Sequence, residues 1–71
     1  MGVEVTGKVL GLIGCGNVGS IVAERAQGLK MRVIVYDPFM TNEHAADLGV
    51  ERVELEILLA RAHFISLHVP L

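Results

Sequence analysis

The sequence has few aromatic residues, a single cysteine and no excess of basic residues. It contains no Trp, one Tyr and two Phe, and its formal net charge at pH 7 is −2. Domains that bind nucleic acid carry a basic patch, so this balance argues against nucleic acid as a partner. One cysteine excludes an intrachain disulfide and fits a reducing compartment. The three histidines lack the spacing of metal ligands, so we expect no bound metal.

Long apolar runs are also missing. No uncharged run reaches the ~20 apolar residues that a membrane-spanning helix needs. Met1 is not followed by the charged and then apolar segments of a secretion signal, so we expect a cytoplasmic protein with no membrane partner. Yet 52% of the residues are hydrophobic, and so small a domain buries only about 60% of its surface. This excess predicts a piece of a larger protein, or a chain that forms a homo-oligomer.

The glycines are the most informative residues that are present. Three of the eight lie in the segment Gly14-Cys15-Gly16-Asn17-Val18-Gly19, which follows the apolar run Val9–Ile13 and opens a stretch with helical periodicity. Asp37 ends the next apolar run, eighteen residues after Gly19. A strand, a glycine-rich turn, a helix and an acid that closes the second strand together form the signature of a dinucleotide-binding fold.

Each residue of the glycine segment has its own chemical reason. Gly14 permits the tight turn out of the strand, and Gly16 lets a pyrophosphate approach the backbone because it has no Cβ. Gly19 lets the helix pack closely on the strand. The N–H groups of Asn17 and Val18 lie in the first helical turn, where no intrahelical acceptor exists, and they favour an anion.

Asp37 is expected to select the cofactor. Its carboxylate can accept hydrogen bonds from the adenosine ribose, whereas a 2′-phosphate would meet like charge there. Pro38, Phe39 and Met40 follow it directly, with no Arg or Lys among them. The sequence therefore predicts NAD rather than NADP as the cofactor.

The remaining segments alternate between strands and helices. We expect strands at 8–13, 32–36, 50–53 and 64–69. We expect helices at 17–29 and 54–62, and between them a short helix capped by Thr41 or Asn42 and ended by Gly49. The third helix has no Ser, Thr or Asp to cap its start, and His63 after it is expected to interact with its C-terminus.

This βαβαβαβ order predicts an α/β fold, a Rossmann-like half domain. Right-handed crossovers give a parallel sheet of order 3-2-1-4, with the first two helices on one face and the third on the other. The fourth strand is left as an apolar edge, which favours association with another chain. Since a full dinucleotide-binding domain has two βαβαβ halves, residues 1–71 are expected to form one partial domain.

With these residues in view, the chain resembles the NAD-binding domain of the D-2-hydroxyacid dehydrogenases, and within that family the phosphoglycerate dehydrogenases most. The most specific matches are Tyr36-Asp37-Pro38-Phe39 and His68-Val69-Pro70-Leu71, and the resemblance covers essentially the whole chain. Other matching stretches are residues 2–8, the loop 14–19, 28–31 and 58–62.

The resemblance implies hydride transfer from a small 2-hydroxy acid to NAD, as in serine biosynthesis. It places the pyrophosphate on the backbone of Asn17 and Val18, and the ribose on Asp37 with Tyr36 and Pro38 beside it. It places the adenosine against the segment His68-Val69-Pro70. Val69 departs from the family's usual Thr, His63 from a usual Asp and Val9 from a Thr.

The family's catalytic Arg, Glu and His fall beyond Leu71, so no residue of this chain is assigned a catalytic role. The substrate domain is absent by the same comparison, and the 2-hydroxy acid is expected to bind only in a full-length parent.

Three other readings stay open. The chain could be an NAD(H)-sensing module without enzymatic activity, or an excised half-domain of structural interest only. A methyltransferase that uses S-adenosylmethionine also has a glycine-rich first loop, but Tyr36-Asp37-Pro38 and His68-Val69-Pro70 favour the dehydrogenases. His68 itself is either a cofactor contact or a structural residue at the end of a strand.

Overall fold

The computed structural model of the chain describes residues 6–14 and 17–67, with the backbone alone described at 17–20. The elements alternate in the predicted order, and each boundary is within one residue of its expected place except the end of β4, whose expected place at 69 lies outside the described residues. They are β1 (Val9–Ile13), α1 (Asn17–Gly28), β2 (Arg32–Tyr36), α2 (Asn42–Leu48), β3 (Glu51–Arg52), α3 (Leu55–Arg61) and β4 (Phe64–Leu67).

The strands form one parallel sheet in the order β3-β2-β1-β4, which confirms the prediction. β1 and β2 are the central strands and pair along their whole length, from Val9 opposite Arg32 to Ile13 opposite Tyr36. Because the sheet is parallel, the carboxyl ends of these strands meet at one edge, where ligands bind in folds of this type.

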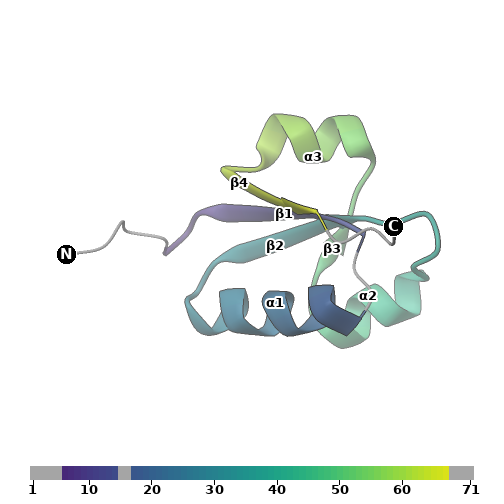
Figure 1. Ribbon diagram of the computed structural model, residues 1–71, viewed down its shortest axis with the longest axis horizontal. Coiled ribbons are helices and arrows are strands. Elements are labelled where there is room, and N and C mark those ends of the chain that lie inside the picture. Colours follow the sequence, from purple (N-terminus) through teal and green to yellow (C-terminus); the bar gives the residue numbers. More distant parts are fainter. Residues whose placement is uncertain (1–5, 15–16, 68–71) are drawn as a thin grey trace.

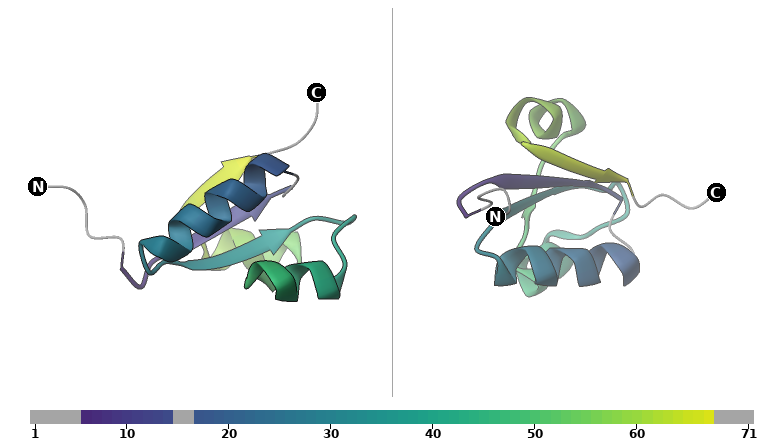
Figure 2. Two further views of the ribbon diagram at one scale, coloured as in Figure 1. Left: turned by 90° about the horizontal axis from the view of Figure 1, so that it is seen from below. Right: turned by 60° about the vertical axis from the view of Figure 1, so that its left-hand side comes forward.

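The helices cover the two faces of the sheet unequally, as predicted. Figure 1 shows α3 alone above the sheet and both α1 and α2 below it. The two views of Figure 2 show the same layers, and α1 and α2 are in contact with one another.

The main core lies between the sheet and the α1/α2 layer. Alternation along the central strands turns Leu10 and Leu12 of β1, and Val33 and Val35 of β2, toward these helices. The cluster comprises Leu10, Leu12, Ala23, Ala26, Val33, Val35, Met40, Ala45 and Val50. This face therefore fixes α1 against the two central strands.

On the opposite face, α3 makes a closer and smaller contact with the sheet. Ile34 of β2 and Leu58 of α3 are fully buried there. Gly11 lies under α3, and a Cβ added to it would be 2.7 Å from Leu58 Cδ2 and 2.9 Å from Ala62 Cβ. The missing side chain of Gly11 is therefore what lets α3 approach β1.

The ends of α1 and α2 share one capping motif. At the end of α2, Gly49 has φ of 72° and the N–H of Val50 donates to the carbonyl of Ala45. Lys30 has the corresponding left-handed φ of 62° after α1, and the N–H of Met31 donates to Ala26.

A side chain ties these two helix ends together. The Gln27 amide donates to the carbonyls of Leu48 and Gly49, at 3.0 and 2.8 Å. The start of α2 is capped as expected, since Thr41 Oγ1 accepts the N–H of His44 at 3.0 Å. At the start of α3 no side chain caps the helix, which also agrees with the prediction.

Several apolar residues that recur at helical spacing in α1 and α3 are exposed. Ile21 and Leu29 of α1 are 53% and 57% exposed, and Leu55 and Leu59 of α3 are 37% and 54% exposed. Helical spacing identifies residues on a common side of a helix, but a narrow sheet covers only the middle of each stripe.

Strand β4 is the apolar edge of the sheet. Its Phe64, Ile65 and Leu67 are among the exposed large hydrophobic residues. This agrees with the expected bare edge, and the homo-oligomer stays a prediction. Within the described part of the chain, no helix is long and apolar enough to cross a membrane.

Candidate functional site

The two halves of the glycine–aspartate signature meet at the carboxyl edge of the sheet. Gly14 leaves β1 with φ of 77°, a left-handed conformation that favours glycine. Its N–H donates to the carbonyl of Tyr36 at 2.9 Å. This bond fixes the exit of β1 beside the end of β2, where Asp37 follows.

Helix α1 begins at this same edge, with Asn17 as its first residue. Its axis therefore presents the N–H groups of its first turn and the positive end of its dipole to the edge. The predicted anion-binding residues Asn17 and Val18 lie in that first turn, followed by Gly19, which was predicted to let the helix pack closely on the strand.

Asp37 shapes the turn that follows β2. Its Oδ1 accepts the N–H of Phe39 at 2.9 Å, and its carbonyl accepts the N–H of Met40 at 3.2 Å. Pro38 suits the second position of such a turn because its ring fixes φ. Met40 is buried in the core, while Phe39 is 93% exposed. The turn thus holds the half-buried Asp37 at the edge of the sheet.

A hollow of about 340 Å³ lies beside Asp37, between the ends of β2 and β3. Tyr36, Asp37, Pro38, Arg52, Val53 and Glu54 line it. The predicted residues Tyr36, Asp37 and Pro38 are therefore brought together, but sequence reasoning did not include the other three. Since β3 pairs with β2, the predicted strand order could have indicated them.

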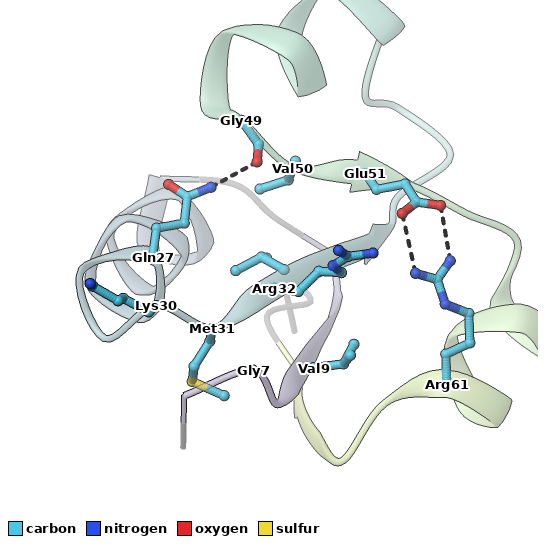
Figure 3. A pocket seen from close by; sticks show the side chains of 11 residues that line it. Gly7, Val9, Gln27, Lys30, Met31, Arg32, Gly49, Val50, Glu51 and Arg61 are labelled. Atoms are coloured by element: carbon cyan, nitrogen blue, oxygen red, sulfur yellow. Dashed lines mark hydrogen bonds and ion pairs between the residues drawn. The ribbon is translucent and has the colours of Figure 1, made fainter. Parts of the chain in front are cut away.

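A second hollow, of about 870 Å³, opens at the opposite, amino edge of the sheet (Figure 3). Gln27 and Lys30, near the end of α1, and Gly49, at the end of α2, contribute to its lining. Helix C-termini carry the negative end of the dipole and disfavour phosphate. The carboxyl edge, where α1 begins, therefore suits a pyrophosphate better, although this hollow is larger and Lys30, Arg32 and Arg61 line it.

An ion pair spans part of this second hollow. Arg61 of α3 donates to both carboxylate oxygens of Glu51, at 2.9 and 3.2 Å, as the dashed lines of Figure 3 show. The hydrogen bond from Arg61 holds the pKa of Glu51 below its ordinary value, and the charge of Arg32 acts in the same direction. The pair is exposed and joins α3 to the edge strand β3.

The remaining predicted site residues are only partly described. For Asn17, Val18 and Gly19 the backbone is helical, as the prediction requires. Gly16 and the segment His68-Val69-Pro70 lie outside the described residues, so their proposed contacts stay predictions.

His63 has a different partner from the one expected. Its Nδ1 accepts the N–H of Val9 at 3.0 Å, and its own N–H donates to the carbonyl of Val9 at 2.8 Å. The side chain therefore joins the start of β1 to the residue before β4, rather than the C-terminus of α3. The prediction was wrong because it considered the nearest helix and not the neighbouring strand.

Known proteins share both the sequence and the fold. Residues 1–71 match the family described as D-isomer specific 2-hydroxyacid dehydrogenase, NAD binding domain. A D-3-phosphoglycerate dehydrogenase of Archaeoglobus fulgidus is 47% identical over 70 residues, covering 99% of this chain and 13% of the relative. A chloroplastic D-3-phosphoglycerate dehydrogenase of Arabidopsis thaliana is 49% identical over 71 residues, covering 100% of this chain and 12% of the relative.

Other members of the family are similar as well. A glyoxylate reductase of Korarchaeum cryptofilum is 46% identical and covers 100% of this chain and 21% of the relative. The apo-structure of D-lactate dehydrogenase from Escherichia coli superposes with a TM-score of 0.88 at 38% identity, covering 99% of this chain and 22% of that one.

An NAD-complexed dehydrogenase of this family from Lactobacillus delbrueckii ssp. bulgaricus gives a TM-score of 0.85 at 32% identity, covering 100% of this chain and 21% of that one. The chain spans 12–21% of the length of the three curated relatives named here. It belongs to the D-isomer-specific 2-hydroxyacid dehydrogenase family, whose NAD-binding domain it matches, and its cofactor is NAD.

Proposed function

We propose that this chain forms the part of a D-3-phosphoglycerate dehydrogenase that holds NAD at the carboxyl edge of its sheet. The observation that carries the proposal is the hydrogen bond from Gly14 to the carbonyl of Tyr36. It places Gly14, at the end of β1, beside Asp37 and at the edge where α1 begins. Pyrophosphate binds the backbone of Asn17 and Val18, and Asp37 accepts hydrogen bonds from the ribose.

The choice of substrate rests on the relatives. Two phosphoglycerate dehydrogenases are 47% and 49% identical to nearly the whole chain, and a glyoxylate reductase is 46% identical. Phosphoglycerate oxidation, the entry to serine biosynthesis, is the function we favour for the parent protein. The chemistry is hydride transfer to NAD, and this part of the protein supplies binding and orientation.

The cofactor site is tested by titrating the 71-residue chain with NAD in a calorimeter. We expect binding by the unmodified chain and none by Gly16→Val, because the added side chain fills the path of the pyrophosphate. Circular dichroism checks that the variant keeps its fold. If the folded variant binds NAD as well as the parent, the loop is not the phosphate site.

The catalytic claim has its own test. The chain alone is expected to bind NAD without producing NADH from 3-phosphoglycerate, because the family's catalytic Arg, Glu and His have no counterpart in it. Measurable turnover by the pure chain contradicts this assignment. In the full-length parent, an Arg, Glu and His at family spacing support the enzyme, and their absence supports the NAD(H)-sensing module.

A further inference from the structure

We propose that Arg52 contacts the 2′ position of the adenosine ribose and lets the site bind NADP as well as NAD. The inference rests on the proposed function, since it concerns the same cofactor edge. It arises from the hollow beside β2, where Arg52 and Asp37 line one cavity although fifteen residues separate them in the sequence.

The sheet register brings the two residues together. Arg52 of β3 is paired with Val35 of β2, and Asp37 follows Val35 by two residues. Asp37 therefore lies in the turn just beyond the end of β2. Paired residues of neighbouring strands share a face, so Arg52 lies with Val35 on the α1/α2 side of the sheet. That is the side on which α1 begins and on which the pyrophosphate is proposed to bind.

A hydrogen bond holds the guanidinium beside the start of α2. Arg52 Nη1 donates to Asn42 Oδ1 at 3.2 Å, at the first residue of α2. A guanidinium has five N–H donors, so this bond leaves others to face a ligand. Its planar fork matches the oxygens of a phosphate, which it can bind in bidentate fashion.

The charges of the hollow set the balance between the two cofactors. Asp37 and Glu54 are carboxylates and Arg52 is the cation in its lining. The carboxylates disfavour a 2′-phosphate and the guanidinium favours it. In dinucleotide-binding folds an acid selects the free ribose and a nearby Arg accommodates the 2′-phosphate. This site holds both kinds of residue, so NAD stays preferred while NADP is tolerated.

The test compares ligands that differ only at the 2′ position. The chain is titrated with NAD and NADP, and with 5′-ADP and 2′,5′-ADP as shorter probes. In Arg52→Gln we expect the Kd for both 2′-phosphorylated ligands to rise about tenfold, the effect of losing one charge-assisted contact. The Kd for NAD and 5′-ADP is expected to change less than about twofold, because those ligands lack the phosphate.

Two further variants sharpen the result. Arg52→Lys keeps the charge but not the fork, and should restore part of the NADP affinity. Arg25→Gln removes an exposed arginine of α1 that lines neither hollow described here, and should leave the ratio of NADP to NAD affinity unchanged.

The outcomes separate the two proposals. If the folded chain binds none of the four ligands, the proposed function fails and the inference with it. If NAD binds but Arg52→Gln leaves the ratio unchanged, or lowers both affinities equally, only the inference is overturned. NADP binding too weak to detect in the unmodified chain also overturns it.

Discussion

The two faces of the sheet are built on different principles. Toward α1 and α2, nine buried residues form a continuous cluster that includes both central strands. Toward α3, the contact depends on the fully buried Leu58 and Ile34 and on the absence of a side chain at Gly11. A continuous hydrophobic cluster secures α1 and α2 on one face, whereas the close approach of α3 to Gly11 secures the other.

The largest expected effect compares one leucine from each face. Leu12 and Leu58 are both fully buried. Leu12→Ala should lower the free energy of unfolding by about 3–5 kcal/mol, because the surrounding cluster cannot close around the cavity. Leu58→Ala should cost about 2–3 kcal/mol, since α3 lies at the surface and can settle toward the sheet.

Urea unfolding of both variants checks this order. If Leu12→Ala does not fold, Leu12→Val can be compared in the same way, because it lowers the free energy of unfolding by less. Equal losses at the two positions would show that both faces pack alike.

The second prediction adds a methyl group where α3 crosses β1. Gly11→Ala should destabilise the chain by about 1–3 kcal/mol, because the new Cβ would lie 2.7 Å from Leu58 Cδ2 and 2.9 Å from Ala62 Cβ, so α3 must shift and lose part of its contact with the sheet. Gly28→Ala is the matched control. Its Cβ meets nothing within 4 Å, and the change should stabilise α1 by about 0.5–1 kcal/mol.

The urea midpoints of both glycine variants are compared with that of the parent. Leu58→Ala in the Gly11→Ala background should recover part of the loss, as expected for coupled residues. A Gly11→Ala variant as stable as the parent would rule out the close approach.

The order of the elements could be predicted because local chemistry determines it. Pro38 stops β2, Thr41 caps α2 and Gly49 ends it with the left-handed backbone that glycine favours. Right-handed crossovers then leave one sheet order. These features need no knowledge of distant residues.

The features that could not be predicted from the sequence depend on contacts between residues that are distant in the chain. The role of Gly11 follows from where α3 crosses β1, and the role proposed for Arg52 follows from the pairing of β3 with β2. His63 bonds to Val9, 54 residues away in the sequence. The glycine loop and Asp37 could be proposed from the sequence because their motif encodes a local turn, but the other residues that line the hollow could not.

The third prediction concerns the end of α1, on the well-packed face. Lys30 adopts φ of 62°, where a Cβ is strained and glycine is not. Lys30→Gly should raise the free energy of unfolding by about 0.5–1 kcal/mol, net of the added flexibility of the unfolded chain. Gly49→Ala makes the opposite change at the end of α2 and should be destabilising, since its Cβ would lie 3.2 Å from Gln27 Nε2. Thermal and urea unfolding measure both, and a lower midpoint for Lys30→Gly would contradict the assignment of strain.

The smallest effect is expected from the ion pair that joins α3 to β3. Arg61 lowers the pKa of Glu51, so the pair stabilises the fold above the ordinary pKa of an unfolded glutamate. This contribution is lost as the pH falls through the lowered pKa. Because both side chains are exposed, salt should screen the effect.

In Arg61→Gln, the Glu51 carboxyl followed by NMR should titrate at higher pH than in the parent, and the two titration curves should approach one another at high salt. If Glu51 titrates identically at low salt in both chains, the ion pair contributes nothing to the stability of the contact between α3 and the sheet.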